Sequence, residues 1–400
     1  MKKTLYTQIE GGKGFWALLA GFGVVILAGL ASMYYMEHNG HWVTGMNNSV
    51  VWGTPHVFAI FLIVAASGAL NVASIGSVFG KKMYKPLAPL SGILAVALLV
   101  GGLAVLVLDL GRPDRLIVAM TNYNFKSIFA WNIILYTGFM AIVAIYLWMM
   151  LEKRFNKYST SVGTFAFVWR LLLTTGTGSI FGFLVAREAY DAALMAPMFV
   201  VMSFSFGLAI FMLVLFASYR MTGRPLGDYV VRRLKNLLGV FVAGVLYFVL
   251  VYHLANLYAT EHHGVESFIL TSGGIYTMLF WVGQILLGSL VPLAILYNPA
   301  TGNSRGWISI ASVLVIFGGL SQLYVLLIGG QAYPMKTFPG YEVTSSFGDG
   351  MIASYSPTLP EVLLGISGFA IALVAVTIAV RHLRALPASL ADGETDPHAA

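Results

Sequence analysis

Cysteine is absent from this 400-residue sequence, and charged residues are scarce. Without thiols the protein forms no disulfide, and it cannot hold an iron–sulfur cluster or a zinc ion through cysteine. Charged residues make up 10% of the sequence, whereas soluble domains contain roughly 25%. Walker motifs, dinucleotide fingerprints and helical histidine pairs of the metal-binding kind are also missing. The sequence therefore excludes the common soluble nucleotide-dependent and thiolate-metal enzymes.

Apolar residues are what the sequence has in abundance: they account for 58% of it, and the mean hydropathy is +0.82. About 20 apolar residues in a helix cross the roughly 30 Å hydrocarbon core of a bilayer. We therefore predict an all-α, polytopic integral membrane protein with ten transmembrane helices. They are expected near Phe15–Met36, Val51–Phe79, Leu87–Leu110, Ile128–Leu151, Val162–Ala186, Pro197–Tyr219, Gly239–Ala259, Ser272–Tyr297, Trp307–Ile328 and Pro360–Leu383.

The basic residues are distributed unequally between the two sides of these helices. Most of the 23 Lys and Arg fall in segments on the side of the N-terminus. The positive-inside rule then predicts that both termini lie in the cytoplasm. We expect the protein in a bacterial cytoplasmic (inner) membrane. The rule also explains the net charge of +7 without nucleic acid as a partner. The first apolar stretch has no cleavage-type site after it, so we interpret it as a retained helix.

Histidines and carboxylates gather on the opposite, non-cytoplasmic side. His56 lies near the outer end of the second helix, and Asp109 ends the third. Oxidation of a quinol releases two protons with two electrons, and a histidine with a nearby carboxylate suits that task. Ionisable residues within membrane spans are usually functional. The alternative is that Asp109 pairs locally with Arg112 or Arg115 in the segment Asp109-Leu-Gly-Arg-Pro-Asp-Arg115.

A stripe of polar residues continues from His56 along one face of the second helix, through Ser67, Asn71 and Ser74. Arg170 lies inside the fifth helix and is a candidate to join the stripe. Together these residues form a possible proton path. Two alternatives stay open: small polar residues commonly line helix–helix contacts in membranes, and Arg170 could extend its side chain to the cytoplasmic surface.

Aromatic and amide side chains surround the start of the fourth helix. Tyr123 and Trp131 could stack on a quinone ring, with Asn132 beside them, or they could belong to the aromatic belt at the membrane interface. Arg187 and Glu188 could belong to the same outer site or form a local ion pair. His56 and His253 are the only candidate axial ligands within the spans, and their helices need not face each other, so we expect no haem.

Two further segments carry expectations. The loop at about residues 329–359 is long enough to be a docking surface or a lid, or simply a solvated connection. Residues 386–400 are small, polar and acidic, and we expect a disordered cytoplasmic tail.

Three motifs together resemble a known family. Trp52-Gly53-x-x-His56 opens a helix that continues through Ala66-Ser67-Gly68-Ala69, Asp109–Arg115 follows the next helix, and Ser127-Ile-Phe-Ala-Trp131-Asn132 begins the fourth. This sequence resembles the NrfD/PsrC family, which supplies the quinone-binding membrane subunit of polysulfide-reductase-type complexes. The resemblance covers roughly residues 50–330. The extra helix at each end is similar to the ten-helix branch with the DsrP and HmcC types of subunit.

The resemblance implies a core of two four-helix bundles, at residues 50–190 and 191–330. Residues 1–49 would then form an N-terminal segment with an extra helix, and residues 331–385 an outer loop with the last helix. It implies a quinone site at His56 and Asp109, with menaquinone or ubiquinone as substrate and no haem or iron–sulfur cluster in this chain. Our candidate quinone-binding set adds Arg112, Tyr123, Trp131 and Asn132.

The implied partners are a periplasmic, ferredoxin-like iron–sulfur subunit, a cytochrome c, and further membrane and cytoplasmic subunits of a complex in sulfur metabolism. A secondary transporter is the alternative function, because ten helices interrupted by glycines also suit that class. Transporters bind substrate near the midplane of the bilayer, whereas the titratable groups here cluster at one face. A purely structural anchor would leave His56 and Asp109 without a role.

Overall fold

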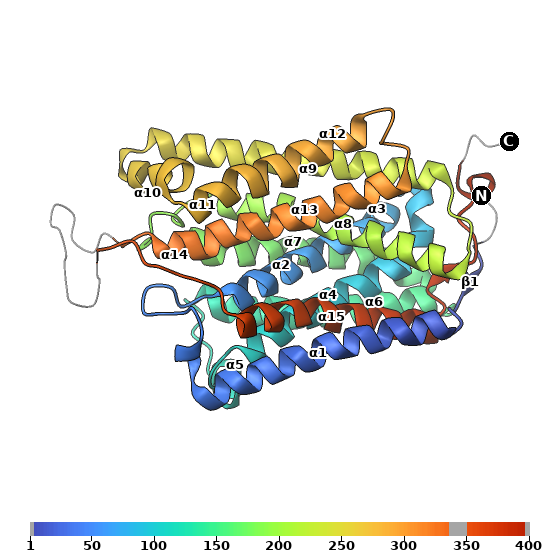
Figure 1. Cartoon of the computed structure of the whole chain (residues 1–400). Coiled ribbons are helices and arrows are strands. Elements are labelled where there is room, and N and C mark those ends of the chain that lie inside the picture. The colour runs from blue at the N-terminus through green and yellow to red at the C-terminus, as the bar shows by residue number, and fades with distance from the viewer. Residues whose placement is uncertain (1–3, 336–349, 397–400) are drawn as a thin grey trace.

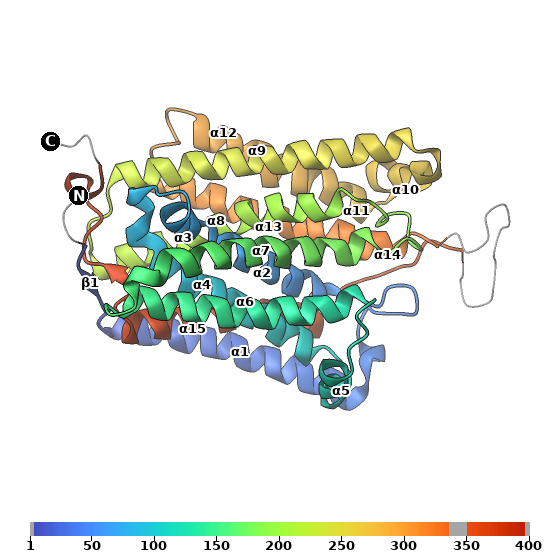
Figure 2. The ribbon, with the colours of Figure 1, turned by 180° about the vertical axis from the view of Figure 1, so that it is seen from behind.

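The computed structural model of the protein describes residues 4–335 and 350–396, and its architecture is almost entirely helical. Long helices run alongside one another in alternating directions (Figures 1 and 2). Each of the ten predicted spans corresponds to a long helix or to a helix continued by a second segment. They are α1 (Lys13–Asn39), α2 (Thr54–Ala69) with α3 (Asn71–Ser77), α4 (Ala88–Leu108), α6 (Ile128–Leu151), α7 (Ser159–Gly182), α8 (Met195–Thr222), α9 (Asp228–Tyr258), α11 (Ile275–Met278) with α12 (Val291–Tyr297), α13 (Arg305–Tyr324) with α14 (Gly330–Ala332), and α15 (Leu359–His382).

Two of these spans contain π-helical stretches. Leu279–Leu290 joins α11 to α12, and Val325–Gly329 joins α13 to α14. A third π-helical stretch, Phe268–Ser272, follows the short helix α10 (His263–Ser267). Such stretches are rare in proteins and are found frequently at functional sites. All three lie in the half of the sequence that follows α8.

By length and composition, nine helices in the described part of the protein could cross a membrane. The remaining long helix, α7, has 24 residues, as many as α6, but it is less apolar because it carries Arg170 and several hydroxyl side chains. It packs against α6 and α8, and its Arg170, Thr174, Thr177 and Ser179 are buried. The composition of α7 therefore reflects its internal contacts.

The short elements complete the two ends of the molecule. They are β1 (Tyr6–Thr7), α5 (Leu116–Thr121), β2 (Leu386–Pro387), α16 (Asp392–Thr395) and the 3-10 turns His41–Val43, Lys82–Leu87, Pro113–Arg115, Asn156–Tyr158 and Thr260–His262. Both termini lie at one end, which we call the termini end (Figure 1). His56 and Asp109 belong to the opposite end, which we call the far end.

The prediction of a disordered tail is wrong for residues 386–396. Strand β2 pairs antiparallel with β1, with Tyr6 opposite Pro387. The carboxylate of Asp392 accepts hydrogen bonds from the backbone N–H groups of Asp228 and Tyr229, at 3.2 and 2.8 Å. The first N–H groups of a helix have no partner within the helix and favour a negative charge. The acidic composition that suggested solvation therefore serves to cap α9. Residues 397–400 lie outside the described residues.

Helix α2 is the centre of the fold and is buried along nearly its whole length. It packs against α4, α7, α8, α13 and α15, whereas α1 lies outside and packs against α15. At the crossing of α2 and α8, Gly68 and Gly207 leave no room for a Cβ, because each would overlap the backbone of the opposite helix. Glycines allow this close approach of membrane helices. Most of the predicted docking loop, residues 336–349, lies outside the described residues.

Candidate functional site

Three titratable side chains meet at the far end. Asp109 follows α4 directly, His56 lies in the first turn of α2, and His41 begins the turn after α1. The distance from His56 Nδ1 to Asp109 Oδ2 is 3.1 Å, and from His41 Nε2 to Asp109 Oδ1 it is 3.7 Å. Two imidazoles thus flank one carboxylate, one at each oxygen. The structure brings the predicted pair His56 and Asp109 together.

The polar atoms of this cluster are not saturated. The Asp109 side chain is fully buried, and those of His41 and His56 are 28% and 22% exposed. Among the described residues, neither Asp109 oxygen nor the facing imidazole nitrogens has a partner at hydrogen-bonding geometry, despite the short ion-pair distance to His56. Buried polar atoms are nearly always hydrogen-bonded in native proteins. The exceptions here sit together and could receive a hydrogen-bonding ligand.

The interactions between Asp109 and the two histidines shift pKa values within the cluster. Burial alone raises the pKa of the Asp109 carboxyl, but the interactions with His41 and His56 outweigh it and leave the pKa below its ordinary value. The contact with Asp109 raises the pKa of His41, against the opposing effect of burial. The contact therefore favours the ionised Asp109 carboxylate beside a protonated His41 imidazole.

The backbone directly after Asp109 turns sharply and contacts His41. Gly111 has φ +63°, in the left-handed region that favours glycine, and a Cβ there would lie 3.2 Å from His41 Cε1. Pro113 then begins the next turn. Arg112 pairs with Asp114 at 3.1 Å, and both side chains are exposed. The alternative in which Asp109 pairs with Arg112 is therefore not what the structure shows.

An aromatic side chain, Trp52, lies beside the cluster. Its ring lies 6.5 Å from the His56 ring at an interplanar angle of 27°, and it also contacts Phe129 and Phe181. The backbone at this point is fixed by Gln331 of α14. The N–H groups of Val51 and Trp52 donate to Gln331 Oε1 at 2.9 and 3.0 Å, and the Gln331 amide donates to the Trp52 carbonyl.

Two further side chains hold the loops around the cluster. Arg187 donates to the carbonyls of Gln331 and Ser49, so its role at the far end is to fix backbone. Glu361, in the first turn of α15, is fully buried and accepts the N–H of Gly45 at 2.9 Å. It also accepts the hydroxyl of Tyr355, which in turn accepts the N–H of Thr54. The loop that carries His41 and the start of α2 are thereby bound to α15.

The other predicted quinone-binding residues have their hydrogen bonds and ring contacts with residues outside the cluster. Tyr123 stacks on Phe125, and Trp131 donates to the Phe125 carbonyl at 2.9 Å. Asn132 is buried and donates to the carbonyls of Ile128 and Gly176, which joins α6 to α7. These hydrogen bonds and ring contacts, and the ion pair of Arg112, involve neither His56 nor Asp109.

The predicted polar stripe does meet α7. Ser67 donates to the Arg170 carbonyl at 3.1 Å, and Arg170 Nη2 donates to Asn71 Oδ1 at 2.8 Å. Arg170 is fully buried and lies over the rings of Phe167 and Phe204, so it does not extend to the surface as the alternative proposed. Its Nε and Nη1 have no hydrogen-bond partner among the described residues.

Ser74, at the end of the stripe, donates to the Leu70 carbonyl of the preceding turn. Ser67 also shares a hydrogen bond with Thr174, at 3.0 Å.

A second histidine–carboxylate pair lies at the far end, in the other half of the sequence. His253 of α9 contacts Glu266 of α10, with Nδ1 2.7 Å from Oε2, and Asn256 donates to Oε1 at 2.9 Å. Glu266 is fully buried. His253 also lines a cavity of about 30 Å³ with Gln284 and Gln322. The sequence suggested His253 only as a haem ligand, and its pairing with Glu266 was missed.

Sequence reasoning also missed the contributions of His41, Trp52, Gln331 and Glu361. Trp52 was visible as part of a motif, and Thr358-x-x-Glu361 before an apolar run is the signature of a helix start. Nothing in the sequence marks Gln331. Among the residues that the structure describes, no three His, Cys, Asp or Glu are placed to hold a metal ion.

Comparison with known proteins decides the family. Residues 42–335 match the family described as polysulphide reductase, NrfD. This protein belongs to the NrfD family. The matched range includes the whole cluster except His41, and it makes the protein a multi-pass integral membrane protein.

Similar NrfD-family proteins are found in archaea and bacteria. The Hdr-like menaquinol oxidoreductase integral membrane subunit of Archaeoglobus fulgidus is 29% identical over 372 residues, which cover 91% of this sequence and 93% of that protein. The menaquinone reductase integral membrane subunit of Nitratidesulfovibrio vulgaris is 25% identical, with 90% and 89% covered. The C subunit of polysulfide reductase from Wolinella succinogenes is 25% identical, with 72% and 96% covered. These names support a quinone-linked membrane subunit of a multi-subunit oxidoreductase.

Proposed function

We propose that this NrfD-family protein exchanges electrons between the membrane quinone pool and an iron–sulfur subunit that docks at the far end. The observation that carries the proposal is the cluster of His41, His56 and Asp109, whose facing polar atoms are buried and lack hydrogen-bond partners within the described residues. Two relatives are named for menaquinol or menaquinone chemistry. Menaquinone is therefore the preferred substrate, and ubiquinone is the alternative.

The residues of the cluster match the needs of a quinol. A quinol hydroxyl donates a hydrogen bond, and the ionised Asp109 carboxylate is an acceptor that the described residues leave without a donor. Oxidation converts the quinol to the quinone and releases two electrons and two protons. Asp109 and the imidazole of His56 can take the protons, and the electrons leave to the partner's cluster, because this sequence has no thiolate ligands for one. Reduction of a quinone runs through the same groups in reverse.

The aromatic and apolar surroundings complete the site. Trp52 lies beside His56 and offers a flat surface to a quinone ring. Gln331 and Glu361 hold the backbone on either side of the cluster, so its geometry is fixed before a ligand arrives. Donors and acceptors that are already held in place lose little conformational entropy when a ligand binds. We place Arg112, Tyr123, Trp131 and Asn132 at most at the margin of this site.

The orientation and the complex are further parts of the proposal. The excess of Lys and Arg at the termini end supports placing both termini in the cytoplasm and the far end outside, in a bacterial inner membrane. The electron partner would then be a periplasmic ferredoxin-like subunit, with a cytochrome c and further membrane and cytoplasmic subunits in the same complex. The polysulfide reductase relative supports a role in sulfur metabolism, as in the DsrP and HmcC types.

A route for protons toward the termini end is a separate hypothesis. Ser67, Asn71 and Arg170 are joined by hydrogen bonds across α2, α3 and α7, and two Arg170 nitrogens find no partner in the described residues. Ser74 continues the stripe. The replacement Asn71→Leu removes the acceptor of Arg170 and should slow proton uptake coupled to turnover. Unchanged uptake and turnover in that variant would end the hypothesis.

Binding of a fluorescent quinol analogue to the purified protein tests the proposal directly. Quenching should saturate for the wild type and be lost in Asp109→Asn and His56→Ala. Asp114→Asn is the matched control, because this exposed aspartate lies in the same segment and pairs with Arg112. Equal binding by all four proteins would place the quinone elsewhere. Thermal unfolding measured in parallel confirms that each variant is folded.

A further inference from the structure

A large cleft at the termini end is lined by positive charge. It has a volume of about 830 Å³ and opens between the end of α6, the start of α7, the start of α4 and the C-terminal segment. Its cations are Lys85, Lys153 and Arg384, and His382 lies beside them. They come from three segments that are far apart in the sequence. Among the described residues that line the cleft there is neither Asp nor Glu.

The protein does not neutralise these cations. In the described residues, none of Lys85, Lys153 and Arg384 forms an ion pair or a side-chain hydrogen bond. Glu152 is the acid next to Lys153 in sequence, and it accepts the backbone N–H of Arg154 instead. Three like charges around one space repel each other unless an anion joins them. The cleft therefore has the charge of an anion site.

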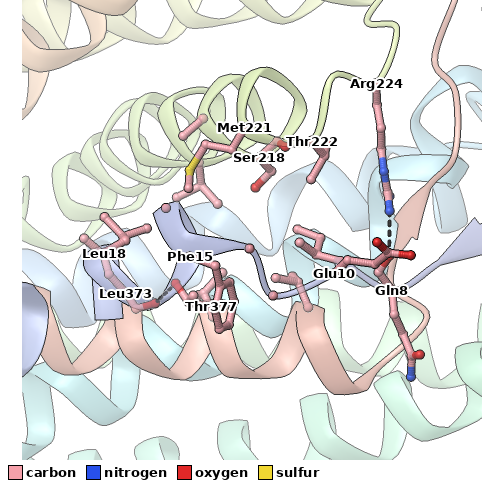
Figure 3. A pocket seen from close by; sticks show the side chains of 18 of the residues that line it. Gln8, Glu10, Phe15, Leu18, Ser218, Met221, Thr222, Arg224, Leu373 and Thr377 are labelled. Atoms are coloured by element: carbon pink, nitrogen blue, oxygen red, sulfur yellow. Dashed lines mark hydrogen bonds between the residues drawn. The ribbon is translucent and has the colours of Figure 1, made fainter. Parts of the chain in front are cut away.

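A second groove, along the N-terminal segment, contains a cation that is already hydrogen-bonded. It is larger, at about 1030 Å³, and lies between residues 7–18, α8 and α15. Figure 3 shows Arg224 directed at Gln8, to whose carbonyl it donates at 2.7 Å. Arg224 also donates to the Pro387 carbonyl, and Glu10 lines the same groove. The cation of this groove is occupied by backbone, whereas those of the cleft remain available to a ligand.

The cleft also has an apolar wall and several hydroxyl groups. Ala88, Pro89 and Met150 lie toward the membrane-spanning parts of α4 and α6. Tyr146 and Ser159 are among the hydroxyl-bearing residues that line it. A small inorganic anion would use the cations and hydroxyls but would leave the apolar wall bare. A molecule with an anionic head and an acyl tail would use both, since the cleft lies where the spans end and the membrane surface begins.

We propose that this cleft binds a phospholipid with an anionic headgroup. Lys85, Lys153 and Arg384 hold the phosphate, and an acyl tail lies along the apolar wall of α4 and α6. Arginine and lysine are the usual phosphate-binding side chains, arginine through paired N–H groups and lysine as a point charge. The lipid would tie the C-terminal segment to the ends of α4 and α6. The site lies at the end of the molecule opposite the proposed quinone site and does not depend on it.

The experiment compares lipids and variants on the delipidated full-length protein. Dioleoyl-phosphatidylglycerol and dioleoyl-phosphatidylcholine are titrated separately, and bound lipid is counted by native mass spectrometry while thermal unfolding is followed. The test variant combines Lys85→Gln, Lys153→Gln and Arg384→Gln. The matched control combines Lys81→Gln, Lys157→Gln and Arg154→Gln, which remove the same charges from the same end outside the cleft. A third arm replaces lipid by inorganic phosphate at equal ionic strength.

The wild-type protein should bind the anionic lipid more tightly than the zwitterionic one and should be stabilised by it. Each cation near a membrane surface contributes roughly a fivefold effect, so the test variant should bind the anionic lipid on the order of 10²-fold more weakly. The control variant should lose clearly less affinity than the test variant, because its cations do not line the cleft.

Three results would overturn it: no lipid preference in the wild type, an equal loss in the control, or equal stabilisation by phosphate alone. The preference of the wild type needs no variant, so poor folding of a mutant cannot obscure the outcome.

Discussion

The two histidine–carboxylate pairs at the far end differ in how fully they are satisfied. In the pair His253–Glu266 the atoms are 2.7 Å apart and hydrogen-bonded, and Asn256 fills the second carboxylate oxygen. In the pair His56–Asp109 the atoms are 3.1 Å apart without hydrogen-bonding geometry, and neither carboxylate oxygen has a donor among the residues described. A buried carboxylate with a partner on each oxygen has less need of a further donor than one with no hydrogen-bond partner on either oxygen.

The surroundings of the two pairs also differ. The cavity next to His253 holds about 30 Å³, which is the volume of roughly one water molecule and far too small for a quinone ring. His41 and His56 keep a part of their side chains exposed beside Asp109. We therefore propose that the chemistry takes place at the His56–Asp109 pair and that the His253–Glu266 pair stabilises the fold. The following experiments test that division.

The largest effect is expected from Asp109→Asn. Loss of a positioned proton acceptor slows a reaction by about 10²–10⁴-fold, so quinol turnover by the assembled complex should fall by that order. Glu266→Gln should leave turnover per folded molecule within a few-fold of the wild type. Turnover is measured with a menaquinol analogue and normalised to folded protein. A greater loss in Glu266→Gln than in Asp109→Asn would reverse the assignment.

The effects on stability should have the opposite order, with the larger loss at the His253–Glu266 pair. Removing one partner of a buried charged pair costs about 3–5 kcal/mol, so Glu266→Ala should lower the unfolding free energy by that amount in detergent. Asp109→Ala should cost less than that, because neither Asp109 oxygen has a hydrogen-bond partner among the described residues. Chemical denaturation followed by tryptophan fluorescence measures both. Comparable losses would mean that the two pairs are equally structural.

A smaller effect is expected from Gly111→Ala. The left-handed conformation costs a residue with a Cβ roughly 1–2 kcal/mol, and the added methyl would press on His41. The variant should therefore be less stable by that amount and should bind the quinol analogue several-fold more weakly. Gly80→Ala is the matched control, because Gly80 also has a positive φ but its Cβ would meet nothing within 4 Å. Equal weakening of binding in both variants would show that His41 is not involved.

The smallest effect is a pH dependence that belongs to the His41–Asp109 contact. The pKa of His41 is raised, so its contribution to stability is complete below its ordinary 6.5 and is lost as the pH rises through the raised value. The pKa of Asp109 is lowered from 3.8, so its contribution is complete above that value and is lost as the pH falls through the lowered one. The contact is therefore fully stabilising between about pH 3.8 and 6.5.

His41→Gln should flatten the alkaline side of the stability profile, while His38→Gln should leave it unchanged. Thermal unfolding across pH measures both profiles. An unchanged alkaline side in His41→Gln would show that another group titrates there.

Features that repeat along a helix were predictable from the sequence, and contacts between distant segments were not. The apolar lengths located the ten long helices, and the motifs singled out His56 and Asp109. The stripe of Ser67 and Asn71 was visible because polar residues on one helical face are unusual in a membrane span. Arg170 was a candidate to join this stripe, and in the structure its guanidinium donates to Asn71.

The remainder depended on tertiary placement. His41 lies in a short turn whose sequence resembles any loop, and the contact of its ring with Gly111 depends on a left-handed bend far along the sequence. Tyr123 and Trp131 have the composition of a ring-binding wall, but both make their contacts with Phe125 in the turn between them. The acidic C-terminal segment appeared solvated because its interaction partner, the N-terminus of α9, lies 164 residues away in sequence.

The dependence of Trp52 on Gln331 also has a consequence for biosynthesis. The backbone beside His56 emerges early during translation, but its hydrogen-bond partners Gln331 and Glu361 are made only after most of the protein has been inserted. A nascent or truncated polypeptide that ends before α14 therefore carries both site motifs and no finished site. We therefore expect the proposed quinone site to form only after the last helices have been inserted.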